Sequence, residues 1–214
     1  MTPPRRLLIT RMSGPTAALL ADYLLAEGAP VPGVLGPKEC ARMFAEKWIG
    51  KTGLLSRLRM SERIYACESV IVPILSRGAL RPATQDDESL LVEWAGEFCR
   101  EAKIEDETAY TQAQLPRLIA KEWLYVWDGG EVVSMAGLGR ETSHGIAVSL
   151  VYTPTRWRNK GYASSCVAKL TNRMLDNGKK FCCLFTDLAN PTSNSIYQRI
   201  GYREICDVDD WVFE

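Results

Sequence analysis

The chain has 214 residues, a length that suits one large domain or two small ones with a sizeable core. Its 26 Lys and Arg residues equal its 26 Asp and Glu residues, so no overall field recruits nucleic acid or an anionic membrane, and neither is expected as a partner. No segment approaches transmembrane length, and the seven cysteines lack paired ligand spacing, which favours reduced thiols in the cytoplasm over a disulfide framework or a zinc site.

Residues 1–77 are predicted to form an N-terminal α/β region. An apolar run begins at Leu7, but Arg11 interrupts it too early for a signal peptide. Glycines and prolines then divide the segment into stretches of strand and helix periodicity. The expected elements are a strand at 7–10, a helix at 15–27, a loop at 30–37, a helix at 38–51, strands at 58–60 and 64–75, and a linker at 77–79.

Residues 78–214 are predicted to form a second domain of mixed helices and strands. Asp128-Gly129-Gly130 is a hairpin turn signal, and Pro154 ends a strand at about Thr153 because proline cannot donate to a sheet ladder. The expected elements are helices at 85–103 and 108–120, hairpin strands at 122–127 and 131–138, a strand ending at 153, a helix at 161–177, a fully buried strand at 181–186, a helix at 192–199 and a last strand region at 202–213.

The junction between the strand that ends near Thr153 and the next helix has the features of an anion-binding loop. The helix is expected to begin at Gly161, where unpaired backbone N–H groups and the positive end of the helix dipole meet. Arg156, Arg158 and Lys160 add positive charge, so a diphosphate would be held mainly by main-chain donors. The alternative is an ordinary solvated basic turn, which the Arg-x-x-Gly-x-Ala pattern alone does not exclude.

A second motif follows downstream, with Asn190, Asn194 and Tyr197 preceding Gly201-Tyr202. In this order the two motifs resemble the GNAT superfamily of acyl-CoA-dependent N-acyltransferases, and the resemblance runs from Arg81 to Glu214. It implies an α/β fold, with a mixed, splayed, mostly antiparallel sheet flanked by helices and an N-terminal α/β extension. The region 1–77 resembles a degenerate GNAT-like half that lacks the anion-binding pattern.

The resemblance also implies acetyl-CoA as co-substrate, with no metal. Asn159 stands where the family often has glycine, and asparagine tolerates the left-handed conformation that such a loop needs. Asn190 is assigned to the pantetheine arm, with a turn or cap asparagine as an equal alternative. The implied binding residues are Val151, Tyr152, Thr153, Arg158, Asn159, Lys160, Gly161, Tyr162, Ala163, Ser164, Asn190 and Asn194.

The implied reaction is direct attack of a primary amine on the thioester carbonyl, within a ternary complex. Tyr197 is the residue that we expect to donate a proton or a hydrogen bond to the leaving thiolate; its alternative role is packing. The base stays unassigned, with Asp187, Glu93 and Glu97 as candidates. A different class of function is an acyl-CoA-binding regulatory or scaffolding protein without turnover. The acceptor amine is not readable from the sequence, and a homodimer stays open.

Two further residues have competing interpretations. His144 is the single histidine, and it is expected in a surface loop before the strand that ends near Thr153, not as the base of a nucleophilic enzyme. Trp157 stands between two arginines, so it is expected either against the adenine end of the cofactor or in a packing role.

Overall fold

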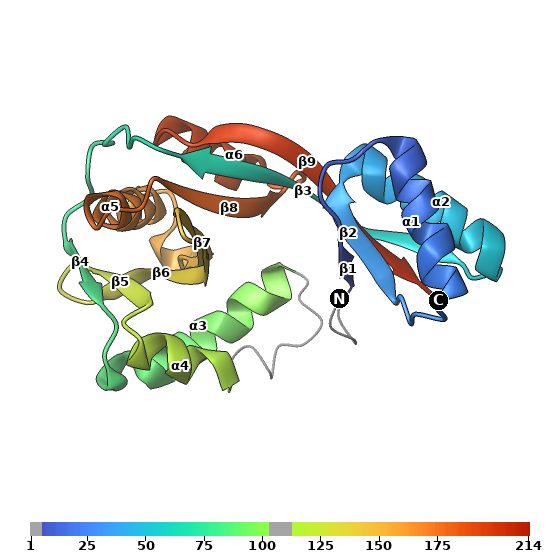
Figure 1. Cartoon of the computed structure of the whole chain (residues 1–214). Helices are drawn as coiled ribbons and strands as arrows, with labels where there is room; N and C mark the ends of the chain where they lie inside the picture. Colours follow the sequence, from blue (N-terminus) through green and yellow to red (C-terminus); the bar gives the residue numbers. More distant parts are fainter. Residues whose placement is uncertain (1–5, 103–112) are drawn as a thin grey trace. The chain divides into compact units, whose positions relative to one another are not determined.

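The computed structural model describes residues 6–102 and 113–214, and these form two compact units (Figure 1). Unit 1 consists of Met1–Ile64, Phe185–Asn190 and Glu204–Glu214, and unit 2 of Tyr65–Leu184 and Pro191–Arg203. In the described part of the chain, nine strands are hydrogen-bonded in the order β1-β2-β9-β3-β8-β7-β6-β5-β4. Three of these strands, β3, β8 and β9, have residues in both units, so the division differs from the predicted boundary at residues 77/78.

Unit 1 packs two helices against one face of its strands. Phe44 and Trp48 of the second helix stack on each other at a ring-centroid distance of 5.7 Å, and they stack with Phe213 of the last strand at 6.5 and 6.1 Å. Ser13 caps the first helix by accepting from the Thr16 N–H. The elements are β1 (Leu7–Leu8), α1 (Gly14–Ala26), β2 (Gly33–Pro37), α2 (Lys38–Thr52), most of β3 (Ser56–Cys67) and most of β9 (Arg203–Phe213).

The expected loop at 30–37 is wrong in its second half, because residues 33–37 form β2. This strand pairs in parallel with β1 and antiparallel with β9. Its glycines are there for close packing, since a Cβ at Gly36 would lie 2.4 Å from Ile9 Cγ1 and one at Gly33 would lie 2.1 Å from the Trp211 carbonyl oxygen. The glycines that predicted a loop are therefore positions where a tightly packed strand has no room for a side chain.

The two expected strands at 58–60 and 64–75 are one strand, β3, which ends at Cys67. Ser61, which falls between the two expected strands, lies inside β3 and donates a hydrogen bond to Asp209 at 2.6 Å. Arg59 pairs with Asp210 and Arg63 with Asp207, each at 2.6 Å. The polar residues at every second position thus form one continuous face that pairs with β9 side chains.

Unit 2 has a sheet with helices on both faces. The Asp128-Gly129-Gly130 turn joins two antiparallel strands, as predicted. Arg81 fixes the start of the unit by binding Asp87 in a bidentate pair and Asp128 through its Nε. The elements are β4 (Ala79–Pro82), η1 (Gln85–Asp87), α3 (Glu88–Glu101), α4 (Leu115–Ala120), β5 (Leu124–Asp128), β6 (Val132–Glu141), β7 (Gly145–Tyr152), η3 (Thr155–Trp157), α5 (Tyr162–Asp176), β8 (Phe181–Asp187) and α6 (Pro191–Arg199).

Alternation along β5 shows how the sheet of unit 2 is covered. Tyr125 and Trp127 belong to the core cluster that includes residues of α5 and α6, while Leu124 and Val126 belong to the cluster that includes residues of α3 and α4. Successive side chains of a strand point to opposite faces, so each face has its own helical layer. The strand after α5 was expected to be fully buried; β8 alternates instead, and Phe185 is 40% exposed.

The helix predicted at 85–103 corresponds to η1 and α3. The helix predicted at 108–120 is confirmed only as the shorter α4, and residues 108–112 of that prediction lie outside the described residues. Pro116 stands at the start of α4, a position where proline is well tolerated because its missing N–H would be unpaired anyway. The predicted strand end near Thr153 and the helix at 161–177 agree with β7 and α5.

Candidate functional site

The predicted cofactor strand, β7, separates from its neighbour β8 after a short stretch of pairing. The parallel register joins Gly145–Ala147 of β7 to Phe181–Cys183 of β8, and the described pairing goes no further. On its other side β7 bulges against β6, with Leu150 in the left-handed region at φ 51° although its side chain is buried. The second half of β7 therefore has an edge without a ladder partner from β8, next to Val151 and Tyr152.

The loop after this strand has the geometry of an anion-binding turn. Arg158 is extended, and Asn159 and Gly161 both adopt left-handed φ values, of 62° and 78°. Asparagine thus adopts the conformation that was expected of it in place of glycine. Gly161 is the N-cap of α5 and provides no side-chain cap, so the N–H groups of the first turn, which includes Ala163 and Ser164, have no capping hydrogen bond from this residue.

Two serines hold this loop in place from behind. Ser76 Oγ donates to the Lys160 carbonyl at 2.7 Å, and the Ser76 N–H donates to Ser165 Oγ at 2.9 Å. Ser165 Oγ in turn donates to the Gly161 carbonyl at 3.0 Å. The carbonyl groups of Lys160 and Gly161 are therefore both hydrogen-bonded to serine hydroxyls. Sequence analysis missed Ser76, because it precedes the loop by more than 80 residues and has no motif of its own.

The basic side chains of the loop already have partners. Arg158 forms two contacts with Glu101 of α3, at 2.7 and 2.9 Å, and its Nε donates to the Thr153 carbonyl at 2.8 Å. The ammonium of Lys160 lies 4.6 Å from the centre of the Trp157 ring, and Arg156 lies 5.9 Å from it. The Trp157 ring also meets Tyr162 edge-on at 6.1 Å, so it packs within the loop. Glu101 is a second residue that sequence analysis missed.

The end of β7 has a carboxylate partner on α3. Tyr152 is buried, and its hydroxyl donates to Glu97 Oε2 at 2.8 Å. Burial, together with this hydrogen bond, raises the pKa of Tyr152 to about 12. Glu97 is therefore the candidate base that contacts the predicted cofactor strand. Glu93, on the same helix, is exposed, and Asp187 accepts from the Ala189 N–H at 2.8 Å as a turn cap.

Tyr197 lies on α6 within a cluster of three tyrosines. Its ring centroid is 6.4 Å from that of Tyr65 and 5.9 Å from that of Tyr202, and the residue is 7% exposed. The hydroxyls of the other two are bonded, to Asn194 at 2.9 Å and to Thr171 at 2.7 Å. The Tyr197 hydroxyl makes no hydrogen bond within the described residues. Burial raises the pKa of this phenol above its usual value.

The other predicted residues are spread between the two units. Val151 packs half-buried against the main core of unit 2, and Tyr162, Ala163 and Ser164 form the half-buried first turn of α5. Asn190 belongs to unit 1, where its N–H donates to the Asp187 carbonyl at 3.0 Å. Asn194 is on α6, and its side-chain oxygen accepts a hydrogen bond from the Tyr65 hydroxyl, so this asparagine also has a structural partner.

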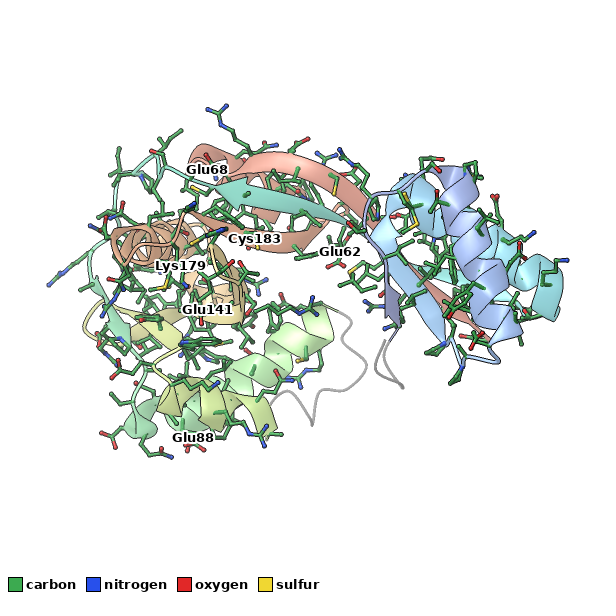
Figure 2. All side chains as sticks on the ribbon, in the orientation of Figure 1. Glu62, Glu68, Glu88, Glu141, Lys179 and Cys183 are labelled. Carbon is green, nitrogen blue, oxygen red and sulfur yellow. The ribbon has the colours of Figure 1, made fainter. Side chains whose placement is uncertain are left out.

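The opposite end of β7 follows an exposed turn. His144 lies exposed in the turn before β7, where Thr142 Oγ1 accepts from the Gly145 N–H at 2.9 Å. Nearby, Glu141 and Lys179 form an ion pair at 2.5 Å, which Figure 2 labels. Over residues 6–102 and 113–214, no group of His, Cys, Asp and Glu side chains is arranged to hold a metal, and no helix is both long and apolar enough to cross a membrane.

The chain is similar to known proteins in one sequence segment and in its fold. Residues 127–212 match the FR47-like protein family. The structure is similar to a GNAT-family acetyltransferase from Colwellia psychrerythraea, with a TM-score of 0.66 and 14% identity over 94% of this chain and 72% of that one. It is also similar to a GCN5-related N-acetyltransferase from Kribbella flavida, with a TM-score of 0.63 and 15% identity over 96% and 77% of the two chains.

A third similar structure is a GCN5-related N-acetyltransferase from Sphaerobacter thermophilus, with a TM-score of 0.59 and 16% identity over 91% of this chain and 68% of that one. No curated protein matches the sequence. At these identities the structural likeness concerns the fold, and it confirms the predicted α/β class, an open sheet flanked by helices. Residues 127–212 thus resemble the FR47-like family, and the chain shares its fold with these GNAT-family and GCN5-related structures.

Proposed function

We propose that the protein is a cytoplasmic N-acetyltransferase that transfers the acetyl group of acetyl-CoA to a primary amine. The observation that carries the proposal is the combination of a diverging β7 edge with the uncapped, doubly left-handed loop at Asn159 and Gly161. An extended arm with amide groups fits the free strand edge, and a diphosphate fits the N–H groups of the loop. Acetyl-CoA has both, joined in that order.

The residues present fit this co-substrate. A Cβ at Gly161 would lie 2.9 Å from Ser76 Oγ, so the loop has room for backbone only at this position. The first turn of α5, at Tyr162, Ala163 and Ser164, would supply the donors. Arg158 and Lys160 would contribute by their positive potential, with Arg158 exchanging its contact with Glu101 for a phosphate oxygen.

The reaction we propose is direct. The amine nitrogen forms a bond to the thioester carbonyl carbon, the carbon–sulfur bond breaks, and the products are an amide and the thiol of CoA. An amine with a pKa of about 10.4 is mostly protonated at pH 7, so a base must take its proton. We assign this task to Glu97, which contacts the end of β7 through Tyr152.

Tyr197 is proposed as the residue that meets the leaving sulfur. Its hydroxyl has no hydrogen-bond partner within the described residues, whereas the hydroxyls of Tyr65 and Tyr202 are both hydrogen-bonded. Because burial raises its pKa, the phenol is a poor proton donor to a thiolate. Stabilisation of the developing charge by a donated hydrogen bond is therefore the better assignment than full proton transfer.

A thiol-release assay with acetyl-CoA and a panel of amines, polyamines, amino acids, aminoglycosides and peptides tests the proposal. Release that depends on an amine, together with the acetylated amine by mass spectrometry, supports it. Glu97→Gln should lower turnover, most strongly at low pH where the amine is protonated, and Glu93→Gln is the matched control because Glu93 is exposed on the same helix. Binding of acetyl-CoA without turnover on any amine would instead indicate a regulatory acyl-CoA-binding protein.

A further inference from the structure

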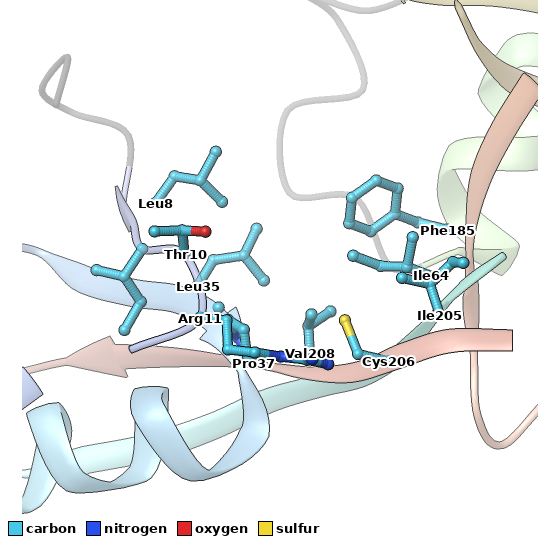
Figure 3. A pocket seen from close by; sticks show the side chains of 12 residues that line it. Leu8, Thr10, Arg11, Leu35, Pro37, Ile64, Phe185, Ile205, Cys206 and Val208 are labelled. Atoms are coloured by element: carbon cyan, nitrogen blue, oxygen red, sulfur yellow. The ribbon is translucent and has the colours of Figure 1, made fainter. Parts of the chain in front are cut away.

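A hollow of about 370 Å³ lies on unit 1, and all of the residues that line it belong to that unit (Figure 3). Volumes of 300 to about 1,000 Å³ are usual for sites that bind small molecules. The lining is mostly apolar, and it comes from β1, the residues 9–11 that follow it, β2, β3, β8 and β9. Its residues are Leu8, Ile9, Thr10, Arg11, Leu35, Gly36, Pro37, Ile64, Phe185, Ile205, Cys206 and Val208.

The hollow is on the face of the unit 1 sheet that α1 and α2 leave uncovered. Val34 of β2 is fully buried in the cluster formed with these helices, whereas Leu35, the next residue, lines the hollow. Adjacent residues of a strand point to opposite faces, so the two belong to opposite sides of the sheet. Three large apolar side chains of the lining are exposed, Leu8 by 61%, Ile205 by 56% and Phe185 by 40%.

Arg11 is the only charged residue of this lining, and it has no carboxylate partner among the described residues. Three acidic residues of β9 already have hydrogen-bond or ion-pair partners. Asp207 pairs with Arg63, Asp209 accepts from Ser61, and Asp210 pairs with Arg59. A second arginine, Arg6, also contacts Asp210, at 2.9 Å. Within the described residues, the hollow thus combines an apolar surface with one cation that has no carboxylate partner.

We propose that this hollow binds a small apolar molecule that ends in a carboxylate. The apolar body lies on Leu35, Phe185 and Ile205, and the carboxylate pairs with the guanidinium of Arg11. An apolar molecule without charge would leave the cation unpaired, and a cationic one would be repelled. This site is separate from the acetyl transfer proposed above and does not rest on it.

Cys206 provides a readout at the site itself. It lines the hollow and is half-buried, as is Cys183 of unit 2, while the other five cysteines are buried. The probe is octanoate below its micelle concentration, with 1-octanol as the neutral analogue and octylammonium as the cationic one. Alkylation of each cysteine by iodoacetamide is followed over time by peptide mass spectrometry of the full chain.

We expect octanoate to slow the alkylation of Cys206 and to leave that of Cys183 unchanged, with 1-octanol weaker and octylammonium weakest. Arg11→Gln should raise the octanoate concentration needed for half-protection about tenfold and remove the preference over 1-octanol. Ile205→Asp should abolish protection by both. Arg117→Gln, an exposed arginine of α4, should behave as wild type.

Three results would overturn the proposal: no protection of Cys206, equal protection by octanoate and 1-octanol in the wild type, or unchanged octanoate protection in Arg11→Gln. Equal protection of Cys183 would also overturn it, since it would indicate nonspecific binding. The labelling rate of Cys206 without ligand reports whether each variant keeps its fold. The readout needs no turnover, so failure of the acetyltransferase assay leaves this test intact.

Discussion

Ser76→Ala removes a hydroxyl that is hydrogen-bonded to the proposed cofactor loop, residues 158–163. The lost hydrogen bond, from Ser76 Oγ to the Lys160 carbonyl at 2.7 Å, is between neutral groups and partly exposed, so its net contribution is about 1 kcal/mol. If the loop must be ordered before a diphosphate binds, the whole of this lost free energy appears in the free energy of binding. A loss of 1 kcal/mol corresponds to about fivefold weaker affinity for acetyl-CoA.

Isothermal titration of CoA and acetyl-CoA measures this effect, and steady-state kinetics should show a raised KM with an unchanged kcat. Ser69→Ala is the matched control, because Ser69 is exposed on the same segment and its contact with Cys67 uses its carbonyl oxygen. Unchanged affinity in Ser76→Ala would refute the bracing role. A fall in kcat at unchanged affinity would refute it as well, since a brace for the loop acts on binding.

A double-mutant cycle gives the same reasoning a second test. Gly161→Ala costs about 1 to 2 kcal/mol because alanine is strained at φ 78°. Where Ser76 is unchanged, the added Cβ would also lie 2.9 Å from Ser76 Oγ. In the Ser76→Ala background the second cost disappears. Urea unfolding should therefore show Gly161→Ala to be less destabilising in that background, by about 0.5 kcal/mol or more. Simple additivity would contradict the contact.

Three further predictions follow from other contacts of unit 2. Tyr197→Phe should lower kcat at least tenfold, roughly, with little change in acetyl-CoA affinity, since one donated hydrogen bond to a developing charge is lost; unchanged kcat would remove the residue from the mechanism. Glu101→Gln should tighten acetyl-CoA binding by about two- to fivefold, because it frees Arg158 from an exposed ion pair, and a weaker affinity would contradict that competition. The Arg81 guanidinium lowers the pKa of Asp87, so this pair stabilises the fold above the unfolded pKa of about 3.9 and the stabilisation is lost as pH falls through the lower folded value. Urea unfolding between pH 7 and pH 3 should show a smaller acid-induced loss for Asp87→Asn than for the wild type.

The elements predicted well are those with local signals. Pro154 ends β7, Gly161 opens α5, and Asp128-Gly129-Gly130 turns the β5–β6 hairpin, and each acts through the conformation of its own backbone. Gly36 and Ser61 were misread because their roles depend on partners far along the chain. Gly36 makes room for Ile9, and Ser61 donates to Asp209 across the sheet. Without the pairing register, the sequence does not distinguish a glycine or serine inside a strand from the same residue in a loop or turn.

The cofactor loop shows the same division between local and distant causes. Its shape follows from Asn159 and Gly161, which the sequence marks, and that shape presents backbone N–H groups. Its electrostatics follow from Glu101 and Trp157, which engage Arg158 and Lys160. Because these side chains already have partners, they gain less from an incoming phosphate than free cations would, since a new contact replaces an old one. The backbone N–H groups in the first turn of α5 receive no side-chain cap from Gly161, so they have no such contact to give up. If the loop binds a diphosphate as proposed, discrimination in its favour would therefore depend more on the left-handed geometry of the loop than on its charge, and the bracing by Ser76 would then affect binding.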